Sequence, residues 1–143
     1  MRFNKRLPNK NDIRQLKKAG SIILVFVILF FIAHDKNISW HSNNGIIIWS
    51  GAYFKAIDYS KVATIILDDP PGLSRKSNGY AAFGKKKGYF IRRKDKEKVL
   101  LFIKRPEQKC IHFLERDGSE VYLNFDNKNK TLKVFNVLKN LNK

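Results

Sequence analysis

The sequence predicts a mainly β domain with one C-terminal α-helix, preceded by one N-terminal transmembrane helix. Three patterns support this fold class. Eleven consecutive residues near the N-terminus, 22–32, are all Ile, Leu, Val or Phe. Short apolar runs with turn residues between them then follow about every ten residues, a spacing typical of an antiparallel barrel or sandwich of about seven short strands. The chain ends on apolar residues at helical spacing.

The length and composition are those of one small domain beside an anchor. A chain of 143 residues has room for a single core once the anchor and its tail are set aside. The formal charge of +17 arises from 29 Lys and Arg against 12 Asp and Glu. Such a positive field attracts an anionic lipid surface, an anionic cell-wall polymer or nucleic acid without choosing among them.

Residues 19–33 are predicted to form the transmembrane helix. At roughly 0.3 to 0.6 kcal/mol per Ile, Leu, Val or Phe, the apolar run favours membrane insertion by roughly 3 to 7 kcal/mol. The run is short for a bilayer of about 30 Å. Lys17 and Lys18 can extend towards the lipid headgroups and Trp40 suits the opposite interface, which offsets part of the difference. Residues 34–44 are polar and are predicted to be a linker.

The distribution of charge sets the expected orientation. Residues 1–18, the predicted basic cytoplasmic tail, carry seven Lys and Arg against one Asp, a net charge of +6. By the positive-inside rule the N-terminus stays in the cytoplasm, and the domain of residues 45–143 is extracytoplasmic. We therefore expect a single-pass protein of the cell membrane. A cleaved signal peptide is the alternative, which is disfavoured because bulky Phe31 would occupy the −3 position of a site after Ala33.

Eight apolar or β-branched runs supply the predicted strands, with clusters of Asp, Ser, Gly and Pro between them. We also place a turn at Asn78-Gly79, because Gly tolerates positive φ and Asn can adopt the left-handed region. The predicted strands lie at residues 45–49, 52–57, 62–67, 80–83, 88–92, 99–104, 110–114 and 121–125.

An amphipathic helix is predicted over about residues 127–141, with Asp126 or Asn127 as its N-terminal cap. Its apolar positions recur at i, i+3, i+4 and i+7. They are Val134, Val137, Leu138 and Leu141. We expect this stripe to cover an open end of the sheet structure rather than to lie on a membrane surface.

Residues 72–93, GLSRKSNGYAAFGKKKGYFIRR, carry a recognisable pattern: Lys76, Asn78 and Gly79, then Gly88 and Phe90 after a short spacer. The pattern resembles the Arg-x-Asn-Gly segment and Gly-x-Phe strand of bacterial pleckstrin-homology-like (PH-like) domains, with Lys in place of Arg unless Arg75 serves. The resemblance covers about residues 45–142. It implies a PH-like seven-stranded barrel behind a membrane anchor and a binding role, and it supplies no ligand.

Residues 75–98 form the most basic part of the domain, with ten Lys and Arg against two acidic residues, a net charge of +8. If a hairpin places residues 85–87 beside residues 92–94, these cations form one patch for phosphates or carboxylates. The alternative is a solvated edge whose lysines deter strand-to-strand aggregation. The predicted binding residues are Arg75, Lys76, Lys85, Lys86, Lys87, Arg92, Arg93 and Lys94.

The sequence offers no constellation for catalysis. The single cysteine, Cys110, excludes an internal disulfide and a thiolate zinc cluster, and its strand-like setting predicts an inert thiol. The pair Asp68-Asp69 falls short of the oxygen ligands that calcium takes. The three histidines, His34, His41 and His112, share no ligand spacing, and the known nucleophile and phosphate-loop motifs are missing from the sequence. We expect no enzyme, no metal and no cofactor.

Two functions follow as predictions. The first is a non-enzymatic, membrane-anchored binding or adaptor module that engages a protein partner in the membrane or envelope. The second is an electrostatic tether or sensor that binds anionic lipid or cell-wall polymer through the basic residues of 75–98. A nucleic-acid module is disfavoured, because the expected topology places the domain outside the cytoplasm.

Overall fold

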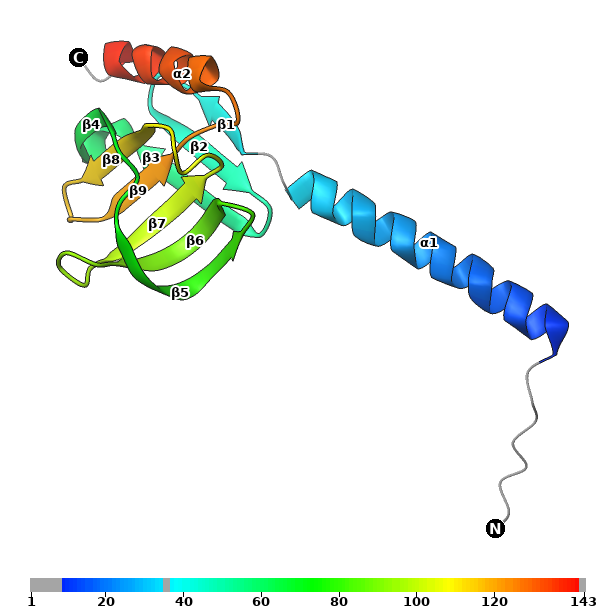
Figure 1. The fold of residues 1–143 in the computed structure, drawn as a ribbon. Helices are drawn as coiled ribbons and strands as arrows, with labels where there is room; N and C mark the ends of the chain where they lie inside the picture. The colour runs from blue at the N-terminus through cyan, green and yellow to red at the C-terminus, as the bar shows by residue number, and fades with distance from the viewer. Residues whose placement is uncertain (1–8, 35–36, 142–143) are drawn as a thin grey trace. The chain divides into compact units, whose positions relative to one another are not determined.

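The computed structural model describes residues 9–34 and 37–141, without the side chains of residues 12, 16, 28–34 and 38. The chain divides into two compact units, Met1–Asp35 and Lys36–Lys143. The first contains one helix, and the second contains every described strand and the C-terminal helix (Figure 1).

Helix α1, Lys10–His34, has 25 residues and a length of about 37 Å at 1.5 Å per residue. It contains the predicted apolar helix and begins nine residues before it, so part of the predicted tail is helical. Asn9 precedes the helix, and its Oδ1 accepts a hydrogen bond from the Asn11 amide at 3.1 Å. Among the residues whose side chains the structure describes, which do not include residues 28–34 of α1, no helix combines the length and the apolar character needed to cross a membrane.

Sheet A has three antiparallel strands in the order β1-β2-β3. These are β1 (Ile38–His41), β2 (Gly45–Ser50) and β3 (Tyr53–Asp58). A short 3-10 helix, η1 (Tyr59–Lys61), then leads out of the sheet. Strand β1 lies inside the predicted linker, so that prediction was wrong for these four residues. The run Ile-Ser-Trp-His is too short for an alternation pattern, and its pairing with β2 makes it a strand.

Sheet B has six strands in the order β4-β8-β9-β7-β6-β5. The predicted exclusively antiparallel pairing was wrong at one place, because β7 and β9 run parallel. The described strands also form two sheets rather than a closed barrel, with β4 and β5 at the edges of sheet B. The strands are β4 (Val62–Asp68), β5 (Leu73–Ala82), β6 (Lys85–Arg92), β7 (Lys98–Ile103), β8 (Cys110–Glu115) and β9 (Glu120–Leu123).

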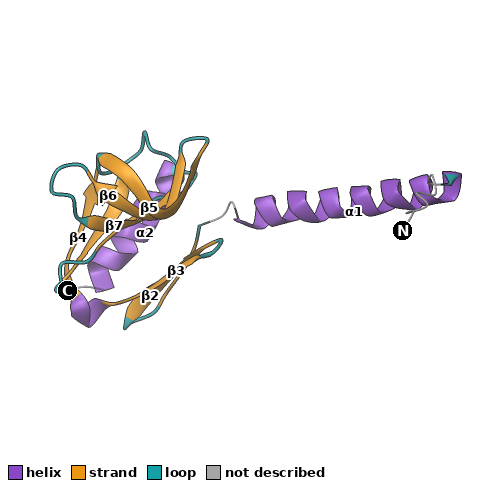
Figure 2. Ribbon diagram, turned by 90° about the horizontal axis from the view of Figure 1, so that it is seen from below, coloured by secondary structure: helices purple, strands orange, loops and turns teal. Residues whose placement is uncertain are grey.

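Two clusters of buried apolar side chains lie on opposite faces of sheet B. Strand β7 contributes to both, which explains its unbroken apolar sequence. Leu100 and Phe102 belong to the larger cluster with sheet A and the C-terminal helix, whereas Leu101 and Ile103 belong to the smaller one. Figure 2 shows the two sheets as separate layers of this domain.

Helix α2, Lys128–Leu141, confirms the predicted C-terminal helix. Asn127 is its cap, since Asn127 Oδ1 accepts a hydrogen bond from the Asn129 amide at 2.8 Å. Leu138 is fully buried in the larger cluster, with Val134 packed against it. The helix contacts β4 and β8 and lies across one end of the sheets (Figure 1). Of the predicted apolar stripe, Val134 and Leu138 pack on the core, together with Phe135, whereas Leu141 is 36% exposed.

The hairpin of β5 and β6 turns at Phe83-Gly84, where φ is +50° and +77°. The turn predicted at Asn78-Gly79 was wrong, because these residues lie within β5, opposite Tyr89 and Gly88, beside a shift in register. Gly79 serves close packing here: a Cβ would lie 2.7 Å from the carbonyl oxygen of Lys87. An apparent turn signal therefore marks an irregular strand.

Candidate functional site: an exposed aromatic face

The outer side of sheet A carries a continuous row of large apolar side chains. Along β2 the side chains alternate, so that Ile46 and Ile48 enter the core while their neighbours point outwards. Strand pairing places Trp40 opposite Ile47, Ile47 opposite Ala56, and Trp49 opposite Phe54. We call these outward residues the aromatic face: Trp40, Ile47, Trp49, Phe54 and Ala56.

The aromatic face is open to solvent. Its four large side chains are 54%, 40%, 49% and 60% exposed, in chain order. Both tryptophans of the chain are among them. The indole N–H of Trp49 donates a hydrogen bond to the Gly51 carbonyl at 2.6 Å. Because this donor is already satisfied, burying the ring against an apolar partner would leave no unpaired N–H.

A group of neighbouring exposed apolar side chains indicates an interaction surface, whereas a single exposed apolar residue does not. Phe83 is 94% exposed, yet it occupies a turn position by itself. On the aromatic face the exposed rings are neighbours on three paired strands, so they form one surface. The sequence does not reveal this surface, because strand β1 and the register between strands were not predictable from it.

A groove of about 650 Å³ borders this surface. Trp40, Ile47 and Ala56 contribute to its wall, together with charged side chains of both signs. One of its lysines, Lys55, is held by an ion pair of 2.5 Å between its Nζ and Glu115 Oε2. The groove therefore offers an apolar wall beside a mixed-charge rim.

The structure separates the predicted basic binding residues into two groups. Lys85, Lys86 and Lys87 begin β6 rather than forming a loop tip, and Arg92 ends the same strand. Seven steps of about 3.3 Å put Lys85 and Arg92 roughly 23 Å apart along the strand. Register places Arg75 and Lys76 opposite Ile91 and Phe90, near the Arg92 end with Arg93 and Lys94.

Two of these basic residues are also poorly placed for an outside ligand. Lys87 is only 4% exposed. Arg92 is occupied by protein carboxylates: its Nε and Nη2 donate to Asp95 at 2.9 and 2.6 Å, and its Nη1 pairs with Glu120. The single patch expected from the sequence is therefore absent: the exposed cations of this set lie near the Arg92 end of the hairpin, whereas Lys85 and Lys86 at the other end are half-buried.

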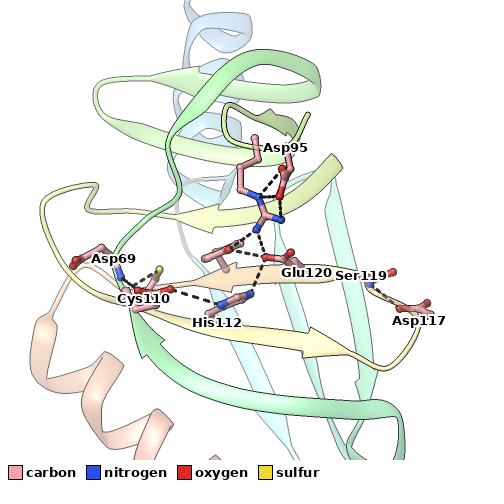
Figure 3. Close-up of polar contacts among 10 residues, drawn as sticks. Asp69, Asp95, Cys110, His112, Asp117, Ser119 and Glu120 are labelled. Carbon is pink, nitrogen blue, oxygen red and sulfur yellow. Dashed lines mark hydrogen bonds and ion pairs between the residues drawn. The ribbon is translucent and has the colours of Figure 1, made fainter. Parts of the chain in front are cut away.

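The polar cluster around Arg92 joins β6, β8 and β9 on the smaller core (Figure 3). Tyr122 Oη donates to Glu120 Oε2 at 2.7 Å, and Arg92 Nη1 donates to Tyr122 Oη at 3.2 Å. His112 stacks on the Tyr122 ring with centroids 4.2 Å apart. Its Nε2 lies 2.9 Å from Glu120 Oε2, without the alignment of a hydrogen bond.

The pKa shifts in this cluster follow from burial and pairing. Hydrogen bonds from Arg92 lower the pKa of Asp95 to about 2. Burial raises the pKa of Glu120, but hydrogen bonds from Arg92 and Tyr122 outweigh it and the net pKa is lowered. The pKa of Arg92 is raised, first by its hydrogen bond to Asp95. The charges of the cluster are thus paired with one another and stabilise the packing of the strands.

Cys110 contributes no nucleophile to this region. Burial raises the pKa of its thiol to about 12, and its Sγ lies 3.3 Å from the Asp68 carbonyl oxygen. A protonated, buried thiol is unreactive at neutral pH, in agreement with the sequence prediction. Among the residues that the structure describes, no three His, Cys, Asp or Glu side chains are grouped to hold a metal ion.

His112 is expected to make stability depend on pH. Burial lowers its pKa, against the opposing pull of Glu120 and Asp68. The unfolded chain, with a His pKa of about 6.5, then binds the proton more readily than the folded chain. Stability is full above about pH 6.5 and falls as the pH drops towards the lowered folded pKa, at up to about 1.4 kcal/mol per pH unit.

The measurement is the free energy of unfolding of the full chain in non-ionic detergent as a function of pH. The matched variant is His112→Phe, which keeps a ring stacked on Tyr122 and cannot titrate. Its unfolding free energy should change less than that of the wild type below pH 6.5. Equal slopes for the two proteins would exclude His112 as the source.

Comparison with protein-family models, curated proteins and solved structures returns no match for this chain. The structure itself defines a class: a mainly β domain of two sheets with a C-terminal helix, preceded by a separate helical unit. Within the β-rich domain, the aromatic face brings four exposed large apolar side chains together on one side of sheet A.

Proposed function

We propose that this chain is a non-enzymatic, membrane-anchored binding module that engages its partner through the aromatic face. The observation that carries the proposal is the grouping of four exposed large apolar side chains on three paired strands. Such a surface costs free energy in water and is typical of an interaction site. The polar cluster around Arg92 offers no comparable opening, since its charged groups are paired internally.

The anchor is proposed from the sequence of residues 19–33. The run of Ile, Leu, Val and Phe favours insertion, and the basic residues before it favour a cytoplasmic N-terminus. The domain would then be extracytoplasmic. The resemblance to bacterial PH-like domains remains a prediction from the same sequence, and the parallel pair of β7 and β9 is a feature that an all-antiparallel PH-like layout lacks.

An adaptor that engages a partner at the membrane has more support than an electrostatic tether. The tether requires the basic residues of 75–98 to act as one patch, whereas Lys87 is buried and Arg92 is paired. The aromatic face requires no rearrangement, because its side chains are already assembled and exposed.

The anchor is tested by membrane extraction and by topology. We expect the full chain to stay in the membrane fraction after an alkaline carbonate wash. A reporter that is active only outside the cytoplasm, fused after Lys143, should be active. Release of the chain by carbonate would overturn the anchor. If the chain is retained but the reporter is inactive, the proposed orientation is wrong and the domain faces the cytoplasm.

The binding surface is tested by photo-crosslinking in intact membranes. A photoactivatable residue in place of Ala56, on the aromatic face, should yield covalent adducts between the chain and its partner. The same residue in place of Ser77, which is exposed on β5 of the other sheet, is the matched control and should yield none. The adducts should disappear with Ile47→Asp, which places a charge within the face. Equal adduct yields at the two positions would overturn the assignment.

A further inference from the structure

We propose that the partner of the aromatic face is the lipid bilayer itself, with the face resting at the boundary between headgroups and acyl chains. This inference rests on the proposed anchor and names the partner of the surface assigned above. The proposed partner is the membrane in which the same chain is anchored. The proposal therefore requires neither a second protein nor a soluble ligand.

The first argument is the short tether in the sequence. Only residues 35–37 separate the end of α1 at His34 from the start of β1 at Ile38. Four steps of at most about 3.6 Å give an extended reach of roughly 14 Å. Trp40 lies two residues further along. A helix anchored in a bilayer therefore keeps this strand close to the membrane surface and at a high effective concentration for it.

The second argument is the chemistry of the face. Tryptophan is enriched at membrane interfaces, where an apolar ring and a polar N–H meet acyl chains and headgroups. Both tryptophans of this chain lie on the aromatic face, together with Phe54 and Ile47. Lys55 of the same strand lies between two exposed residues, Phe54 and Ala56, and pairs with Glu115. The outward positions Ile47, Trp49 and Phe54 thus carry no charge.

The third argument is area. Aromatic side chains bury about 150 to 250 Å² each, so three half-exposed rings and Ile47 present on the order of 400 Å². A stable interface between proteins buries about 800 Å² on each partner. The face alone is thus too small for a second copy of this chain, whereas a tethered membrane contact needs no such area.

The two tryptophans report on this face directly, because they are the only ones in the chain. The experiment places the full chain in vesicles of phosphatidylcholine and phosphatidylglycerol, with or without bromine near the headgroup end of the acyl chains. We expect brominated lipid to remove most of the tryptophan emission, and aqueous acrylamide to remove little. Ile47→Asp should reverse both results while the chain remains in the vesicles.

A matched control moves the reporter to an exposed aromatic position on the other sheet. In the triple variant Trp40→Phe, Trp49→Phe, Phe83→Trp, the only tryptophan occupies the β5–β6 turn. Its emission should be quenched by acrylamide and not by bromine. Bromine quenching at this position but not at Trp40 and Trp49 would place a different surface on the membrane and overturn the inference.

Flotation of the vesicles separates failure of the anchor from failure of this inference. A chain that does not float with the vesicles overturns both. A chain that floats, with Trp40 and Trp49 open to acrylamide and insensitive to bromine, overturns the lipid contact alone. Protection from both quenchers, with emission that depends on the protein-to-lipid ratio, would instead assign the face to a second copy of the chain.

Discussion

Replacement of Asn124 by alanine is expected to lower the free energy of unfolding by about 4 kcal/mol, since four backbone groups lose a partner at a cost of about 1 kcal/mol each. The Asn124 side chain is fully buried. Its Oδ1 accepts from the amides of Lys104 and Arg105 at 2.7 and 3.2 Å. Its Nδ2 donates to the carbonyls of Arg105 and Gln108 at 2.7 and 3.3 Å.

The backbone of Asn124 also connects the two sheets. Asn37 Nδ2, just before β1, donates to the carbonyl oxygens of Asn124 and Phe102 at 2.8 and 2.7 Å. Ser50 Oγ at the end of β2 donates to Asn37 Oδ1 at 2.6 Å. Loss of the Asn124 side chain loosens the segment to which sheet A is tied. The aromatic face should therefore lose order along with the domain.

The matched control is Asn127→Ala, the same chemical change three residues later. Asn127 is exposed and caps α2 with one hydrogen bond to the Asn129 amide. Loss of such a cap costs about 1 kcal/mol. Urea unfolding of both full-length variants in non-ionic detergent, followed by circular dichroism, measures the difference. Equal effects of the two substitutions would show that the Asn124 hydrogen bonds contribute little net stability.

Local patterns predicted the strands of this protein well. Each of the eight predicted runs overlaps an observed strand, because alternating or continuous apolar residues mark half-buried or fully buried strands. The segment of β5 before Tyr80 was missed, because an exposed edge strand with Arg75 and Lys76 lacks an apolar face. Its partner β6 supplies the hydrogen bonds that make it a strand.

The pairing of the strands was not predictable from local patterns. Strand β9 lies between β7 and β8, parallel to one and antiparallel to the other. Between Leu100 and its partner Val121 the chain forms strand β8 and the turn into β9. The sequence of neither paired strand indicates whether the pairing is parallel or antiparallel. The antiparallel prediction therefore failed at this step, although both strands were located.

The candidate site was missed for a related reason. Trp49 and Phe54 were separated in the sequence prediction by a turn, and only their register makes them neighbours. The prediction of a basic binding site did not account for burial. Lys87 lies opposite Phe102 in the sheet and is buried. A long lysine side chain can cover apolar neighbours with its methylene groups. Counting charges along the chain does not distinguish such a lysine from an exposed one.

Gly88→Ala is expected to destabilise the domain by about 2 to 5 kcal/mol, from about 1 to 2 for the left-handed backbone and about 1 to 3 for overpacking. Gly88 is buried on β6 with φ at +92°. A Cβ there would lie 2.5 Å from the Tyr53 ring and 2.6 Å from the Asn78 carbonyl oxygen. The carbonyl belongs to the sheet and cannot withdraw, and displacement of Tyr53 would shift β3.

Gly118→Ala separates the two contributions to this effect. Gly118 has a similar φ of +86°, but its added Cβ would meet no atom within 4 Å. Only the backbone cost of about 1 to 2 kcal/mol should remain. Urea unfolding of the two variants in detergent gives the comparison, and tryptophan emission reports whether sheet A moves. If Gly88→Ala costs no more than Gly118→Ala, then Tyr53 yields freely and sheet A is not held in place by its packing on β6.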